Sequence, residues 1–197
     1  MKEPAMAFLT HAQYLQQTAD LGGGHWKNAP TRWIYHEAAI SILREIGLTA
    51  PGEVLEMGTR GISILPGSDT IDHGRKRTPG RQPPSILHDP RQLPWPIADG
   101  AYGAFVALRV FHRLHPVQRA CFLEARRIAR TILIVVPETH DLSRSGDGAR
   151  GIPAATFTEW NDGVPPTLVV RFARWIGNLY FWDETALRPR SGGTAAP

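Results

Sequence analysis

Short, continuous runs of apolar residues, separated by connections rich in Gly, Pro and charged residues, mark the middle of the chain. Strands with one face in water alternate apolar and polar residues, whereas continuous runs are typical of parallel strands covered on both faces. The runs predict such strands at residues 53–57, 70–71, 85–87, 104–108 and 131–136. Two further strands, at residues 167–172 and 178–182, are predicted to close the sheet with an antiparallel edge.

Helices are predicted before and between these strands. In residues 31–46, apolar side chains recur at every fourth position, at Ile34, Ala38, Ile42 and Ile46. Residues 116–130 are amphipathic, with Cys121, Phe122, Ala125 and Ile128 predicted inward and Arg119, Glu124, Arg126 and Arg127 predicted outward. A short helix is predicted near residues 156–161. The alternation of strands and helices predicts an α/β fold with right-handed crossovers.

The composition is that of one soluble globular domain, with 197 residues, 42% apolar and 20% charged. No basic segment followed by a long apolar run begins the chain, so we expect a cytoplasmic protein with no membrane partner. The single cysteine, Cys121, excludes an internal disulfide and a Cys-rich zinc site, and is predicted to lie in the core. The histidines lack the paired spacing of a metal site, so no metal is predicted.

The net charge of +4 is small, and arginines are spread along the whole chain. The densest basic run, residues 74–81, contains Pro and Gly and no aromatic residue, which is typical of a solvent-exposed loop. The charge pattern therefore argues against a nucleic-acid partner and favours a small-molecule substrate. The oligomeric state stays open.

Carboxylates follow three of the predicted strands. Glu56, Asp72 and Asp89 come at or just after the ends of the first, second and third strands. In an open parallel sheet, ligands bind outside the carboxyl ends of the strands, and an acidic residue after the second strand can accept hydrogen bonds from a ribose diol. The alternative is that each carboxylate only makes the local hydrogen bonds common in turns.

The order and spacing of these segments resemble the class I S-adenosylmethionine-dependent methyltransferases, particularly the small, type 11-like members. Residues 54–58 (VLEMG) match the first motif of the family, and residues 68–72 (SDTID) match its second strand. Residues 88–96 (HDPRQLPWP) match an acidic residue followed by an L-P-aromatic turn. The fourth strand with its loop and the fifth strand are matched by residues 107–114 and 132–138.

This resemblance implies a Rossmann-like, doubly wound, mostly parallel seven-stranded sheet with an antiparallel edge and helices on both faces. It also implies S-adenosylmethionine as the cofactor. By analogy, Glu56 and Gly58 border the methionine part, with Arg60 and Gly61 in the same turn. Asp72 holds the ribose hydroxyls, while Asp89 and Pro90 lie near the adenine. Arg109 and His112, just past the fourth strand, would face the methyl group and the substrate.

The glycine motif of the chain departs from that of the family. Arg60 stands where the backbone should approach the cofactor closely, so its side chain either blocks the pocket or pairs with Glu56 or with the cofactor's carboxylate. The connection from Glu56 to Asp72 is short and contains Pro66 and Gly67. The usual first helix is therefore predicted to be cut to about a turn or lost.

Two features have alternative interpretations. His112 is either a general base, because imidazole titrates near neutrality, or a structural residue that caps its loop together with His115. Residues 22–28 combine a run of glycines with Trp26 and Lys27. They predict either a lid over the carboxyl edge of the sheet or a strap on the surface.

The predicted organisation is a lid or strap at residues 1–29, a methyltransferase-like domain at 30–187 and a disordered tail at 188–197. Two functions follow from different classes of protein. One is methyl transfer to an oxygen or nitrogen of a small polar metabolite or sugar. The other is a catalytically inactive relative that has lost the cofactor and serves as a binding or scaffold protein, because fold alone does not fix function.

Overall fold

The computed structural model describes residues 8–19, 28–73, 83–138, 149–173 and 175–183. Its seven strands form one sheet in the order β3-β2-β1-β4-β5-β7-β6. The strands are β1 (Val54–Met57), β2 (Asp69–Asp72), β3 (Ile86–Leu87), β4 (Tyr102–Leu108), β5 (Ala129–Val136), β6 (Leu168–Arg171) and β7 (Asn178–Asp183). β1 to β5 pair in parallel, and β7 runs antiparallel to β5 and β6. The predicted fold class is confirmed, including its antiparallel edge.

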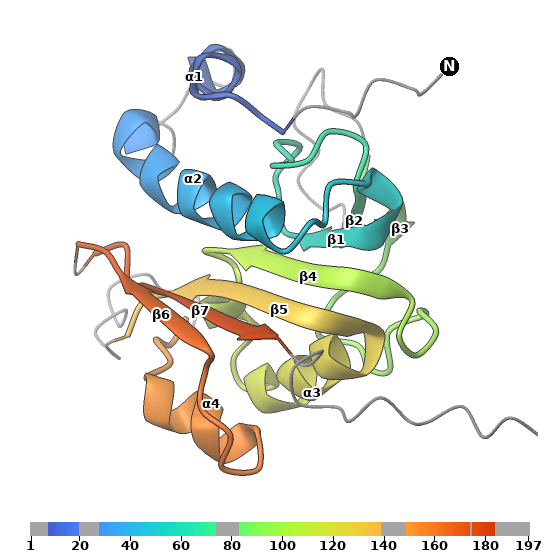
Figure 1. Ribbon diagram of the computed structural model, residues 1–197. Coiled ribbons are helices and arrows are strands. Elements are labelled where there is room, and N and C mark those ends of the chain that lie inside the picture. The colour runs from blue at the N-terminus through green and yellow to red at the C-terminus, as the bar shows by residue number, and fades with distance from the viewer. Residues whose placement is uncertain (1–7, 20–27, 74–82, 139–148, 174, 184–197) are drawn as a thin grey trace, which may run out of the picture.

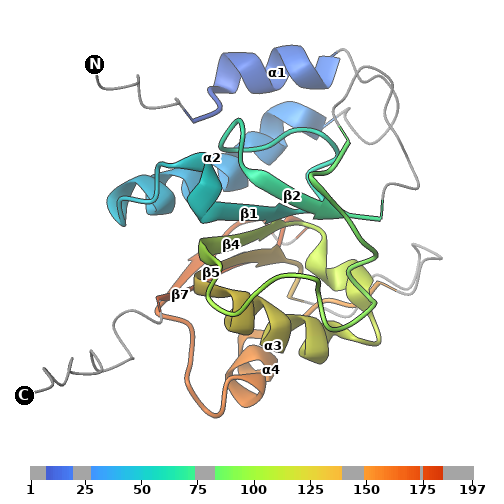
Figure 2. The ribbon, with the colours of Figure 1, turned by 90° about the vertical axis from the view of Figure 1, so that its right-hand side faces the viewer.

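Helices cover both faces of the sheet (Figures 1 and 2). α1 (His11–Ala19) and α2 (Ala29–Glu45) lie on one face, and α3 (Gln118–Ile128) and α4 (Ala154–Trp160) lie on the other. Short 3-10 turns, η2 (Pro51–Glu53) and η3 (Phe111–Leu114), precede β1 and follow β4. Because successive strand residues point to opposite faces, each face has its own apolar core, with Val54 on the α2 side and Leu55 and Met57 on the α3 side.

The buried face of α2 differs from the predicted one. Ile34, predicted inward, is 48% exposed. The buried residues are Ala29, Tyr35, His36, Ala39, Ile40, Ile42 and Leu43. α2 lies between α1 and the sheet and therefore buries two adjoining faces, which a single stripe of apolar residues does not represent.

The sequence did not predict α1, which packs on α2. The ring of the fully buried Tyr14 lies 5.5 Å from that of Trp33 and 4.7 Å from that of His36, centroid to centroid. Phe8 and Leu9 are also buried, and the backbone N–H of Leu9 donates to the carbonyl of Ile64 at 2.9 Å. The folded domain thus includes residues 8–19, and the predicted boundary at residues 29 and 30 falls in the first turn of α2.

The connection between β1 and β2 contains turns and no helix, as its length predicted. The predictions for residues 22–27, including Trp26 and Lys27, lie outside the described residues. The same holds for the basic run at 74–81 and for the tail at 188–197.

Candidate functional site

The carboxyl ends of β1 and β4 lie side by side at the point where the winding of the sheet reverses. Met57, the last residue of β1, pairs with Ala107 of β4. β2 and β3 continue the sheet on one side of this pair, and β5 continues it on the other. Ligands bind at this edge in open parallel sheets, so the candidate site consists of the residues that follow these strands.

The turn after β1 is left-handed at three positions. Gly58, Arg60 and Gly61 have φ values of 66°, 53° and 81°. A Cβ atom at Gly58 would lie 2.5 Å from Cγ2 of Val110, so glycine is required for packing as well as for conformation. The Gly58 turn therefore brings the end of β1 directly against the segment that follows β4.

Glu56 is buried, with 2% of its surface exposed. Its carboxylate accepts hydrogen bonds from the backbone N–H groups of Ile64 at 3.0 Å and Leu65 at 3.2 Å, and from the Ser68 hydroxyl at 2.6 Å. Burial raises the pKa of Glu56 to about 7, although these hydrogen bonds oppose the rise. The carboxylate thus holds together the helix-free connection to β2, and it is directed into the fold.

Asp72 ends β2 with its side chain at the edge and 31% exposed. One carboxylate oxygen accepts the backbone N–H of His73 at 2.7 Å and lies 3.5 Å from Nδ1 of the same residue. This partial exposure leaves the carboxylate accessible at the edge.

Arg60 is exposed beside the Gly58 turn. Partial removal from water lowers the pKa of its guanidinium, and the charges of Arg113 and Arg32 lower it further, whereas Asp72 raises it. The carboxylate that attracts Arg60 is therefore that of Asp72, while the Glu56 carboxylate is bound to its own connection. Arg60 lies in the same turn as Gly58, and the side chain nearest to a Cβ atom at Gly58 would be that of Val110.

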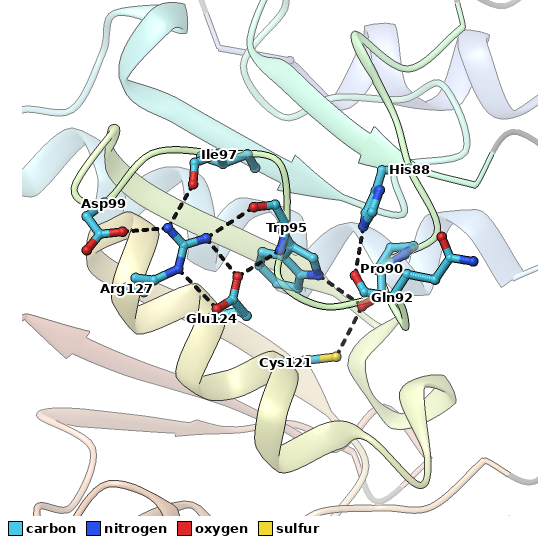
Figure 3. Close-up of polar contacts among 9 residues, drawn as sticks. All are labelled: His88, Pro90, Gln92, Trp95, Ile97, Asp99, Cys121, Glu124 and Arg127. Carbon is cyan, nitrogen blue, oxygen red and sulfur yellow. Dashed lines mark hydrogen bonds and ion pairs between the residues drawn. The ribbon is translucent and has the colours of Figure 1, made fainter.

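Asp89 and Pro90 follow β3. A carboxylate oxygen of Asp89 accepts the backbone N–H of Arg91 at 3.1 Å, and its carbonyl accepts that of Gln92 at 2.8 Å. Asp89 thus makes the local turn bonds that the sequence offered as the alternative role. Pro90 is buried, and its carbonyl accepts hydrogen bonds from the Trp95 indole at 2.9 Å and the Cys121 thiol at 3.3 Å (Figure 3).

Trp95 anchors the helix-free segment between β3 and β4. Its side chain is 2% exposed, and its ring lies 5.5 Å from that of Phe105 of β4. Its backbone N–H donates to Glu124 at 2.9 Å, and its carbonyl accepts from Arg127 at 3.2 Å (Figure 3). The segment that carries Asp89 is therefore fixed to α3.

The predicted outward orientation of Glu124 and Arg127 is wrong. Arg127 donates two hydrogen bonds to Glu124, at 2.7 and 3.0 Å, and others to the Ile97 carbonyl at 2.7 Å and the Asp99 carboxylate at 2.6 Å. The hydrogen bond from Arg127 is the main cause that lowers the pKa of Glu124. Both side chains turn toward the segment before β4, because its backbone lacks the hydrogen bonds that a helix would provide.

Arg109, a predicted catalytic residue, follows β4 with a φ of 61°. Its backbone N–H donates to Val135 at 2.9 Å, and its guanidinium donates to the carbonyl of Ile176 at 2.5 Å. Burial lowers the pKa of the guanidinium, while the neighbouring Tyr35 raises it. Arg109 therefore lies at the edge on the α2 side, where it joins β4 to the turn between β6 and β7.

His112, the other predicted catalytic residue, is 5% exposed in η3. Its carbonyl accepts hydrogen bonds from the backbone N–H of Arg150 at 2.9 Å and the side-chain amide of Gln118 at 3.2 Å. This burial beside α3 favours the structural role that the sequence left as the alternative.

Three residues that the sequence did not single out also lie near this edge. Arg32 and Tyr35 lie in the first half of α2, and Arg113 lies in η3. A signal for Arg32 was available, because a helix that leads into a first parallel strand has its amino end near the carboxyl ends of the strands. Arg113 had no comparable signal.

Within the described residues, no three His, Cys, Asp or Glu side chains come together in a way that could hold a metal ion. Nor does any helix of this described part have the length and apolar character needed to cross a membrane.

Several solved methyltransferases are similar to this chain in structure. The magnesium protoporphyrin IX methyltransferase ChlM from Synechocystis PCC 6803, solved with bound SAM, aligns with a TM-score of 0.56 at 13% identity, over 87% of this chain and 90% of ChlM. The N-methyltransferase NodS from Bradyrhizobium japonicum WM9, in complex with S-adenosyl-L-homocysteine, gives 0.58 at 13% identity, over 85% of this chain and 95% of NodS.

A third match is a chain from the complex of the Haloferax volcanii Trm112 methyltransferase activator with a protein described as a methyltransferase. Its TM-score is 0.58 at 15% identity, over 86% of this chain and 96% of that chain. No protein-family model and no curated protein sequence matches the chain. The chain therefore has the class I methyltransferase fold, established by structure at low sequence identity.

Proposed function

We propose that the chain is an S-adenosylmethionine-dependent methyltransferase that transfers a methyl group to an oxygen or nitrogen of a small polar metabolite or sugar. The observation that carries this proposal is the position of Asp72. Its partly exposed carboxylate ends β2 next to the Gly58 turn, at the edge where the winding of the sheet reverses.

The residues at this edge fit such a cofactor. Asp72 would accept hydrogen bonds from the ribose hydroxyls, and Asp89 with Pro90 would lie near the adenine. Arg60, an exposed cation beside Gly58 and Gly61, suits the carboxylate of the amino-acid end. Glu56 would support this arrangement indirectly, because its carboxylate holds the connection that follows the turn.

When bound, the cofactor supplies a methyl group already activated by the positive sulfur, so the protein mainly has to position the acceptor. We assign Arg109, whose guanidinium donates to the Ile176 carbonyl at this edge, to positioning the acceptor. A role for His112 as general base requires access to an acceptor proton. Its test is the pH dependence of kcat/KM in His112→Asn, which should lose the limb near neutrality if His112 is the base.

The proposed cofactor site is tested by calorimetry with S-adenosylmethionine and S-adenosylhomocysteine. Asp72→Asn should weaken binding by about 1 to 3 kcal/mol, because the charged acceptor of the ribose hydroxyls is lost. The matched control is Asp69→Asn at the opposite end of β2, where the carboxylate accepts from the Tyr102 hydroxyl at 3.0 Å. Equal affinities in the two variants would remove Asp72 from the site, and no binding by the folded wild-type protein would refute the proposed function.

A further inference from the structure

Four arginines from three parts of the chain gather at the carboxyl edge of β1 and β4. Arg60 follows β1, Arg109 and Arg113 follow β4, and Arg32 lies in the first turn of α2. The amino end of α2 is at this edge because the helix leads back to the start of β1. The four are close enough to interact, since Arg32 and Arg113 both lower the pKa of Arg60 and of Arg109, in each case after burial as the main cause.

Contacts with the protein orient the guanidiniums of Arg109 and Arg32. Arg109 donates to the carbonyl of Ile176, and Arg32 forms a side-chain hydrogen bond with Tyr35. Tyr35 is itself buried, with 4% of its surface exposed. Arg32, Arg109 and Arg113 are all partly buried, so their positive charges are less screened than they would be in water.

The edge therefore has an excess of positive charge. Among the described residues, the carboxylates of Asp72, Asp89 and Glu138 follow β2, β3 and β5 at this edge, and the four arginines outnumber them. S-Adenosylmethionine would bring a further positive charge on its sulfur. Like charges brought together in partly dehydrated surroundings repel, and a negative ligand would relieve the repulsion.

We propose that the methyl acceptor is a small molecule with a carboxylate or phosphate group, which Arg32, Arg109 and Arg113 bind at the carboxyl edge. This inference rests on the proposed methyltransferase function. Planar guanidinium groups match the oxygens of carboxylate and phosphate, often with two parallel hydrogen bonds. The group would hold the acceptor on the α2 side of the edge, while its negative charge offsets the positive sulfur.

This arrangement couples the two ligands. An oxyanion at the arginines should strengthen the binding of S-adenosylmethionine more than that of S-adenosylhomocysteine, because the second molecule lacks the positive sulfur. Inorganic phosphate is the probe, and each nucleoside is titrated calorimetrically with and without phosphate at matched ionic strength. We expect phosphate to raise the ratio of the two affinities in favour of S-adenosylmethionine by at least about fivefold.

Arg113→Gln should abolish this phosphate effect, and even without phosphate it should shift the affinity ratio toward S-adenosylmethionine. The control is Arg119→Gln, on the exposed surface of α3, which should behave like the wild type. Circular dichroism and the melting temperature establish that each variant is folded.

The outcomes separate the two proposals. Binding of both nucleosides with an affinity ratio indifferent to phosphate would overturn the anionic acceptor and leave the methyltransferase function standing. If neither nucleoside binds, the proposed function fails. In that case the oxyanion site is tested by melting temperature alone. It stands if phosphate raises the melting temperature of the wild type and not that of Arg113→Gln, and it fails otherwise.

Discussion

Individual residues at the turn after β1 have roles that their motif positions do not reveal. Gly58 was predicted to border the methionine part of the cofactor, and in the structure it also lets Val110 pack against the end of β1. Glu56 was predicted to border the methionine part, and its carboxylate binds the connection at Ile64, Leu65 and Ser68. Gly58 and Val110 are distant in the sequence, and the Glu56 contacts depend on how its connection to β2 turns back, so pattern alone predicted neither.

Gly58→Ala should destabilise the protein more than Gly100→Ala. Both glycines are left-handed, with φ of 66° and 62°, so both variants incur about 1 kcal/mol or more of backbone strain. At Gly58 the new methyl group also meets Val110, whereas at Gly100 no atom lies within 4 Å. We expect Gly58→Ala to lose about 2 kcal/mol more in urea unfolding. Equal losses would show that Val110 moves aside at no cost.

Glu56 should make stability fall as the pH rises. Its pKa is about 7 in the folded protein, above the ordinary value of 4.5, so the folded state binds the proton more tightly. This contribution is fully present below the unfolded pKa and is lost as the pH rises through the folded one. Between about pH 4.5 and pH 7.5, wild-type stability should fall relative to that of Glu56→Gln by roughly 3 kcal/mol. Parallel pH profiles in urea unfolding would contradict this assignment.

At the scale of elements, side chains of α3 bind the helix-free segment between β3 and β4. The backbone N–H of Trp95 donates to Glu124, and its carbonyl accepts from Arg127 (Figure 3). The Trp95 indole donates to the Pro90 carbonyl. The network fixes the segment that begins with Asp89 at the site. The network thus stabilises the segment that is proposed to lie near the adenine of the cofactor.

Arg127→Met should therefore destabilise the protein by about 2 to 4 kcal/mol, because carbonyls of the segment and the Glu124 carboxylate lose their donor. The neighbouring Arg126→Met is the matched control. Its ion pair with the exposed Asp162 spans 3.5 Å, so its loss should change stability by less than about 1 kcal/mol. Chemical denaturation of both variants measures the difference. Similar losses would mean that the network adds nothing beyond a surface ion pair.

The strands could be predicted from the sequence because most of them contain a short apolar run, and all seven appear within a few residues of their expected bounds. The helices were harder to predict from the sequence. Of the residues of α1, only Tyr14 and Thr18 are buried, which is too few to produce a helical period of apolar positions, and α2 buries two faces.

The part of the site that lies at the strand ends could be predicted from the sequence. The arginine from α2 and the inward turn of Glu124 depend on tertiary contacts.

At the scale of the whole molecule, the amino-terminal part belongs to the core. Deleting residues 1–27 would remove Phe8, Leu9 and Tyr14, which are each at most 4% exposed. We therefore expect this deletion to lower the free energy of unfolding by at least about 3 kcal/mol. Deleting residues 1–7, which removes none of the described contacts, is the control. Equal melting temperatures for the two deletions would contradict a core role for α1.

The central claim is that S-adenosylmethionine binds at the carboxyl edge between β1 and β4. The most direct measurement is an amide NMR titration of the isotope-labelled full chain with S-adenosylhomocysteine, which reports binding and its location together. We expect saturable shifts at Gly58, Gly61, Asp72 and His73, with Asp69 and Gly100 at the opposite edge unchanged. Shifts confined to the opposite edge, or no shifts at millimolar ligand, would contradict it.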